Sequence, residues 1–210
     1  TAGNLDVQLE YKAADGWHPV LPETNLFGSS KWEPGHTEYV QLKISNAGSL
    51  ALKYNFTANV FADNAGTQAE KQYTAMNGTT FKLSDYLVFS KTAGAEKVTN
   101  RESLWIADEA AEKACMGTKA FENVNMTNDL LIPDASEEIT LAVYMPTWVG
   151  NEANYKTGTA VPEIFLGLNL IATQTPYEKE KDSFNENYDK DVAYPTLVAS
   201  TEELKTAIAE

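Results

Sequence analysis

Residues 32–60, WEPGHTEYVQLKISNAGSLALKYNFTANV, decide the fold class. Apolar side chains occupy every second position on both sides of the centre of this stretch, at Val40, Leu42 and Ile44 and again from Leu50 onward. A period of two places one face of a strand on a core and leaves the other face toward solvent. The stretch therefore predicts two β-strands joined by a short connection.

Two turn signals accompany these strands. Pro34 and Gly35 form a dipeptide typical of a turn just before the first strand. Residues 46–49, Asn-Ala-Gly-Ser, separate the two strands, and Asn and Gly tolerate the left-handed backbone of a tight connection. The flanking strands therefore either pair as a hairpin or turn a corner between two sheets.

The same alternation recurs along the chain, and it predicts further strands at residues 5–11, 139–143 and 164–170. Residues 83–89 fit either a short helical turn or a strand. Leu104, Ala107, Ala111 and Cys115 follow a spacing of three to four, which predicts a helical insertion around residues 100–116. We expect an all-β, jelly-roll-like sandwich of two sheets with this insertion.

The predicted strands all lie in residues 1–178, which we interpret as one sandwich domain. Residues 179–196 are polar and acidic, as is typical of a linker. In residues 197–210, Ser200 and Glu203 have the spacing of a capping box. The apolar residues that follow predict a short helix there, which could open a further domain.

The charge of the chain excludes some partners. The formal net charge is −14, with only 16 Lys and Arg residues. Nucleic-acid backbones bind clustered cations, so we expect no nucleic-acid partner. The sequence has no apolar run of about 18 residues, so we expect no membrane insertion.

The residues that most often carry catalysis are scarce. His18 and His36 are the two histidines, Cys115 is the one cysteine, and the common hydrolase, nucleotide-binding and zinc-protease motifs do not occur. A catalytic zinc usually needs three protein ligands, and the histidine spacing suggests no such set. We therefore predict a protein that is not an enzyme, with no catalytic, cofactor-binding or metal-binding residue.

Calcium binding and sugar binding are two further hypotheses, and each has a simpler alternative. The oxygens of Asn185, Asn187, Asp189 and Asp191 could bind calcium, but Lys190 replaces the glycine of a calcium loop, so a solvated linker is favoured for residues 182–191. Several aromatic residues could stack on sugars, although packing is favoured for them. These aromatic residues are Trp17, Trp32, Trp105, Trp148, Tyr144 and Tyr155.

Three ordered motifs resemble the TasA/camelysin family of secreted surface and biofilm-fibre proteins. Residues 3–7, Gly-Asn-Leu-Asp-Val, resemble the segment after the mature amino terminus of that family. The Pro34-Gly35 turn, the following strand and residues 46–50 resemble a second signature, and residues 164–174, which end in Ala-Thr-Gln, resemble its closing strand. The similarity spans roughly residues 3–177.

The resemblance implies a Gram-positive source, secretion through a SipW-type signal peptidase, and a fibre-forming or surface-displayed structural role in the extracellular biofilm matrix. In TasA-like fibres an amino-terminal segment of one subunit adds as a strand to the next, so copies of this chain or related subunits are the expected partners. An exposed sheet edge has unpaired amides that such a strand satisfies. Here the first predicted strand begins close to Thr1, and we therefore expect this chain to be a monomer or a weak oligomer.

Two alternatives to a structural role stay open at the level of sequence. An adhesin-like ligand-binding domain would need an exposed aromatic or polar groove on the sandwich. A zinc metalloendopeptidase is the activity that the resemblance to camelysin implies, but no zinc motif is present to carry it over.

Overall fold

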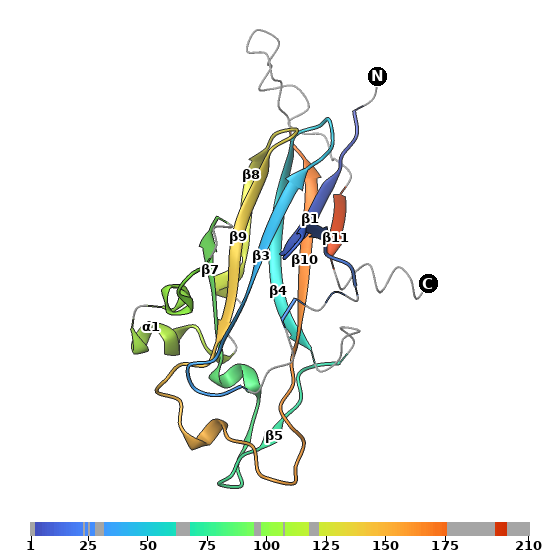
Figure 1. The fold of residues 1–210 in the computed structure, drawn as a ribbon. Coiled ribbons are helices and arrows are strands. Elements are labelled where there is room, and N and C mark those ends of the chain that lie inside the picture. The colour runs from blue at the N-terminus through green and yellow to red at the C-terminus, as the bar shows by residue number, and fades with distance from the viewer. Residues whose placement is uncertain are drawn as a thin grey trace.

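The structure is a computed structural model that describes residues 3–22, 24, 26–27, 32–61, 68–94, 98–106, 108–117 and 122–175, and the backbone of residues 196–200. Two antiparallel sheets pack face to face (Figure 1). The first sheet has the order β2 (Gly16–Pro19), β1 (Val7–Ala13), β3 (Thr37–Asn46), β9 (Ser136–Tyr144), β7 (Val88–Ala93). The second has the order β11 (Thr196–Ser200), β10 (Phe165–Gln174), β4 (Leu52–Phe61), β8 (Met126–Leu131). The predicted all-β sandwich is confirmed.

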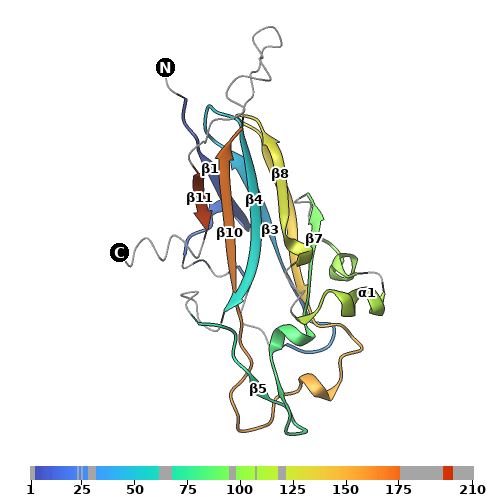
Figure 2. The same cartoon turned by 180° about the vertical axis from the view of Figure 1, so that it is seen from behind.

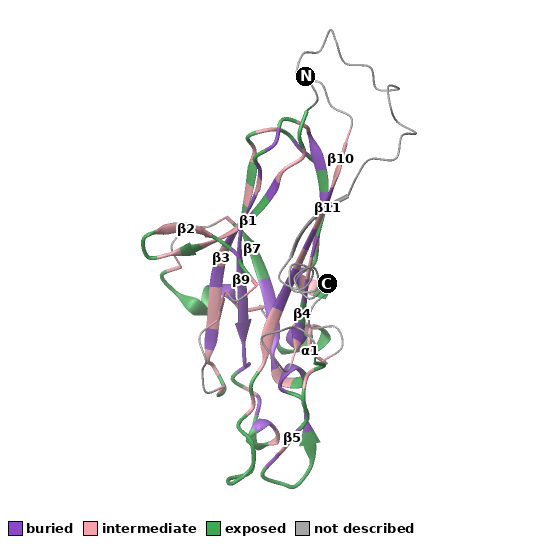
Figure 3. Cartoon of the chain, turned by 90° about the vertical axis from the view of Figure 1, so that its right-hand side faces the viewer, coloured by how far each residue is buried: buried purple, intermediate pink, exposed green. Residues whose placement is uncertain are grey.

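The core lies between the two sheets. Leu42 in β3, Phe56 in β4 and Leu168 in β10 have no exposed surface, while their sequence neighbours Gln41, Asn55 and Asn169 are less buried. The buried positions alternate along β3 and β4 as the sequence pattern predicts (Figure 3). Burial of about 25 cal/mol per Å² of apolar surface makes this alternation the main stabilising contribution to the fold.

Residues 46–50 form a corner between the sheets rather than a hairpin. β3 belongs to the first sheet, and β4, which follows immediately, belongs to the second. The turn before β3 is also present: the His36 amide donates to the Glu33 carbonyl at 2.9 Å, and Gly35 adopts a φ of 87°. The chain crosses repeatedly from one sheet to the other, which is the connectivity of a jelly-roll-like sandwich.

The helical insertion is present, but it is two short helices instead of one. A 3₁₀ helix, η2 (Arg101–Leu104), precedes α1 (Glu109–Ala114). Each helix has its own cap, because the Asn100 side chain accepts from the Glu102 amide and the Asp108 side chain accepts from the Ala111 amide. An N-cap in mid-segment ends one helix and starts another. Figure 2 shows the insertion beside β7, at the side of the sandwich away from β11.

Residues 83–89 fit either a short helical turn or a strand in sequence, and the structure contains both. The 3₁₀ helix η1 (Leu83–Tyr86) comes first, and β7 begins two residues later. Further 3₁₀ turns are η4 (Glu122–Val124) and η5 (Asn151–Ala153), and a two-stranded hairpin of β5 (Tyr73–Thr74) and β6 (Thr80–Phe81) extends from one end of the sandwich. None of these elements interrupts the two main sheets.

The prediction for the C-terminal segment needs a correction. Residues 196–200, assigned above to the end of a linker and the start of a helix, form strand β11, which pairs with β10. Leu-Val in this segment has high strand propensity, and the open edge of β10 supplies the partner. The acidic segment 179–195, its calcium hypothesis and the rest of the predicted helix lie outside the described residues.

Candidate functional site

The two histidines lie apart, each next to one carboxylate. His18 Nε2 is 2.7 Å from Asp15 Oδ1, and this contact lowers the pKa of Asp15. His36 Nε2 is 2.9 Å from Glu38 Oε1, and the edge of Trp32 lies against its ring. Among the described residues, no group of three or more His, Cys, Asp or Glu side chains is placed to hold a metal ion.

Glu112 is a buried carboxylate on the short helix α1. It is 7% exposed, and its Oε1 accepts from the Tyr144 hydroxyl at 2.8 Å while its Oε2 accepts from Trp148 Nε1 at 2.6 Å. The Tyr144 hydroxyl in turn accepts from the Ile106 amide. Burial, together with Glu112, raises the pKa of Tyr144 well above its usual value. This cluster holds α1 against the end of β9.

A second polar contact joins the two sheets. The Tyr54 hydroxyl on β4 donates to Glu137 on β9, and the Asn128 amide on β8 donates to the other oxygen of the same carboxylate. Burial, followed by the hydrogen bond to Glu137, raises the pKa of Tyr54. Charge-assisted hydrogen bonds of this kind fix the relative position of the two sheets.

The aromatic residues considered as a sugar platform are largely engaged within the protein. Trp105 stacks on Tyr144 with ring centroids 5.4 Å apart, and its Nε1 donates to Thr37. Lys113 lies over the Trp148 ring, and Lys12 and Lys43 lie near the face of Trp17. All four tryptophans are partly buried. Tyr155 is the most exposed member of the set at 38%. These contacts favour packing over ligand stacking.

Two motifs far apart in the sequence meet in space. The Asn4 carbonyl accepts from the amides of Ser49 and Leu50 at 3.0 and 3.2 Å, and the Asn4 side chain accepts from the Ser49 hydroxyl. A Cβ on Gly48 would lie 2.5 Å from the Asn4 carbonyl oxygen, so only glycine fits there. Residues 3–6 are thereby fixed against the corner at residues 46–50, at one end of the sandwich.

Asn46 explains why the corner starts with asparagine. Its Nδ2 donates to the carbonyls of Leu50 and Leu131, at 2.8 and 2.9 Å, and its Oδ1 accepts from the Gly48 amide. Asn46 is 1% exposed, so these contacts replace the water that its amide loses on burial. One side chain thus connects the corner to the end of β8.

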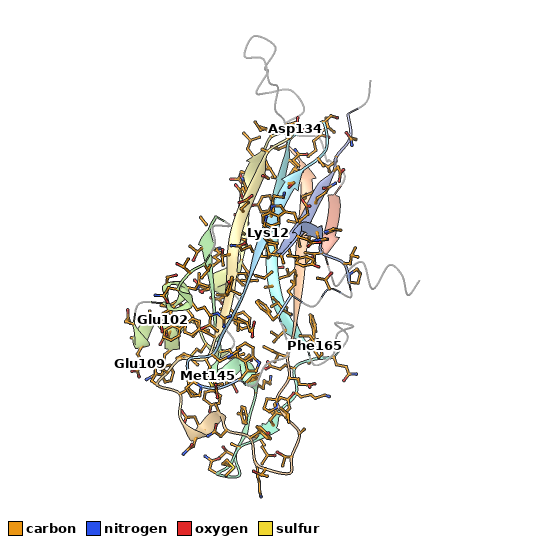
Figure 4. All side chains as sticks on the ribbon, viewed as in Figure 1. Lys12, Glu102, Glu109, Asp134, Met145 and Phe165 are labelled. Carbon is orange, nitrogen blue, oxygen red and sulfur yellow. The ribbon has the colours of Figure 1, made fainter. Side chains whose placement is uncertain are left out.

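The two sides of β10 are paired to different extents. β10 pairs with β4 over its full length, from Phe165 opposite Phe61 to Gln174 opposite Leu52. On its other side β10 pairs with β11 only from Asn169 to Thr173. β10 therefore continues past the end of β11 for residues 165–168. Phe165, labelled in Figure 4, lies at the end of β10 that β11 does not reach.

The strand β11 closes one side of the sandwich. It lies beside β1 of the first sheet as well as beside β10, and both views of the ribbon show this arrangement (Figures 1 and 2). At the opposite edge of the second sheet, β8 has a register irregularity where it pairs with β4 between Leu52 and Tyr54. Bulges and short strands are means by which proteins limit pairing at an edge. On the other side of the sheet, the five-residue β11 is the edge strand beside the ten-residue β10.

Comparisons with known proteins give little further information. No family model matches the chain, and no curated protein matches it. Among solved structures, the ASH/PapD-like domain of human CEP192 (PapD-like domain 7) is similar at 11% sequence identity, covering 92% of this chain and 80% of that one, with a TM-score of 0.33. The fold assignment rests on the strands described above. Within the described residues, no helix is long and apolar enough to span a bilayer.

Proposed function

We propose that this chain is a non-enzymatic, extracellular structural module whose copies form fibres or a surface-displayed matrix by adding a strand to a sheet edge. The resemblance of residues 3–7, 34–50 and 164–174 to the TasA/camelysin family suggests this role. The single observation that carries the proposal is the edge of β10, which accepts a strand over five residues and continues past it. An extended strand gains affinity there from main-chain hydrogen bonds.

The distribution of polar contacts also supports a structural role over an enzymatic one. Glu112 and Glu137 bind side chains of neighbouring elements and so stabilise the packing of the fold. A net charge of −14 favours solubility of the secreted chain and keeps copies apart until specific pairing occurs. An adhesin-like role gains no comparable support, because the tryptophans pack against neighbouring side chains.

The assembly of the purified chain tests this proposal. Light scattering and negative-stain electron microscopy, followed over rising protein concentration, should detect oligomers or filaments. The variant Ile171→Lys should reduce assembly at least several-fold, because Ile171 lies in the part of β10 that pairs with the added strand and a lysine there opposes pairing with another chain. Asn55→Lys is the matched control, since Asn55 is exposed on β4, away from this edge.

The control should assemble like the unmodified chain. If Ile171→Lys and Asn55→Lys assemble equally well, the β10 edge is not the contact. If the unmodified chain shows no self-association at any concentration or salt condition, strand addition between copies is wrong for this protein.

A further inference from the structure

We propose that β11 is an exchangeable strand: the β10 edge holds residues 196–200 of its own chain in the monomer and the same residues of a second copy in the assembled form. The inference rests on the proposed function and deepens it, because it names the donor strand and the acceptor strand. An exchange of identical elements preserves every contact of the monomer, so it needs little new binding energy.

The connection between β10 and β11 is much longer than the geometry requires. The two strands are antiparallel, and Thr173 lies opposite Thr196, so the chain leaves β10 and enters β11 at the same end. A loop of two to five residues closes such a pair. Residues 176–195, twenty in all, intervene instead.

That length allows the strand to reach a neighbouring molecule. Twenty residues span at most about 70 Å when fully extended. A ten-residue strand such as β10 is about 33 Å long. A segment of this length can therefore return to its own β10 or carry β11 to the β10 of an adjacent copy. The intramolecular and intermolecular forms then compete through protein concentration.

The hold on β11 is weak compared with that on the other strands of its sheet. β11 pairs over five residues on one side, whereas β10 pairs with β4 over ten. Each main-chain hydrogen bond contributes on the order of 1 kcal/mol net, so a short edge strand detaches far more easily than a central one. Release of β11 leaves β10 as a ten-residue open edge beside the core.

β10 has a buried polar atom where it pairs with the last residue of β11. Asn169 lies opposite Ser200 at the end of β11. Its Oδ1 is buried, and no described residue donates a hydrogen bond to it. An unsatisfied buried oxygen lowers the stability of the closed form.

Single-cysteine chains test the exchange directly. Ile171 and Val198 are Cα partners across β10 and β11, which is a separation that a disulfide can bridge. In a Cys115→Ser background, one chain carries Ile171→Cys and the other carries Val198→Cys. A mixture of the two at high concentration under mild oxidation should give a disulfide-linked heterodimer, identified by mass spectrometry of the linked peptides.

The matched control replaces the first chain by Asn55→Cys. Asn55 is the partner of Ile171 on the opposite side of β10, so it lies two strands away from Val198 in either form. We expect at least a tenfold lower yield of heterodimer from this mixture. Equal yields from the two mixtures would overturn the proposal.

A chain that carries both Ile171→Cys and Val198→Cys locks β11 in place and separates this inference from the proposed function. The oxidised chain should remain monomeric, and reduction should restore assembly. Assembly of the oxidised chain would show that exchange of β11 is wrong while leaving assembly at another edge in place. Failure of the reduced and unmodified chains to self-associate would overturn both proposals.

Discussion

A single carboxylate, Glu112, connects α1 to the end of β9 through the Tyr144 hydroxyl and the Trp148 indole. Glu112→Ala leaves two buried donors without an acceptor, so we expect the free energy of unfolding to fall by about 2–4 kcal/mol. Glu112→Gln keeps one acceptor oxygen and should cost less. Urea denaturation followed by tryptophan fluorescence measures both effects.

The control for this change lies on the same helix. Glu109 is exposed and forms an ion pair with Lys113, so Glu109→Ala should alter the free energy of unfolding by less than about 1 kcal/mol. An effect of Glu112→Ala as small as that of Glu109→Ala would show that the buried cluster does not stabilise the fold.

Tyr54 and Tyr144 make stability depend on alkaline pH. Burial raises the pKa of each hydroxyl above the usual value of 10.0. The unfolded chain therefore loses these protons first, so the stabilising contribution is complete below about pH 10 and decreases as the pH rises further. The free energy of unfolding, measured by urea titration from pH 7 to 11, should decline above pH 10.

The variant Tyr54→Phe isolates one of these hydroxyls. It should be less stable at pH 7 because Glu137 loses a donor, and its decline above pH 10 should be shallower. Between pH 7 and 9 the two stability curves should run parallel. A decline of equal steepness in both proteins would contradict the assignment to Tyr54.

At the scale of elements, the corner at residues 46–50 and the segment of residues 3–6 form one unit. Gly48→Ala places a methyl group against the Asn4 carbonyl and the Asp6 amide, at 2.5 and 2.7 Å. Overpacking against backbone typically costs about 1–3 kcal/mol. We expect a drop in thermal midpoint, and faster amide exchange in residues 3–6 as the segment detaches.

Ala47→Ser is the companion variant, because Ala47 is exposed in the same connection. It should leave both the thermal midpoint and the exchange of residues 3–6 unchanged. If Gly48→Ala behaves like Ala47→Ser, the close approach at Gly48 does not hold the segment in place.

The strands were predictable from sequence because burial on one face imposes a period of two, as in β3 and β4. The choice between a hairpin and a corner at residues 46–49 was not predictable, since Asn and Gly suit both. The corner follows from distant contacts, above all those of Asn46 with Leu131. The burial of Glu112 was equally invisible, because its partners Tyr144 and Trp148 are more than 30 residues away in sequence.

The strand β11 was missed for a different reason. Its five residues end at Ser200, the first residue of a capping-box pattern. That pattern predicts a helix, and the apolar run before it is too short to predict a strand. No local feature shows that β10 has an open edge that such a segment can join. The aromatic residues were better predicted, because packing was favoured over ligand stacking and Trp105 and Trp148 do pack within the protein.

At the scale of the whole molecule, the sandwich has two different sides. On one side, η2 and α1 lie beside β7, and the Lys91 ammonium donates to the Asn125 carbonyl between β7 and β8. On the other side, β1 and β11 lie next to each other, and the residues 3–6 segment ends near them. Assembly through β10 would therefore use the side of the sandwich that β11 closes. The helical insertion lies on the other side and would not take part in the contact.

Amide hydrogen exchange of the assembled chain against the monomer tests assembly at the β10 edge most directly. Exchange measured by mass spectrometry should be slower in residues 169–173 of β10 in the assembled form, because a strand held between two copies opens less often than the short edge strand of the monomer. Protection that stays unchanged in β10 while it rises in β8 (Met126–Leu131) would contradict the account and place the contact at the opposite edge of the sheet.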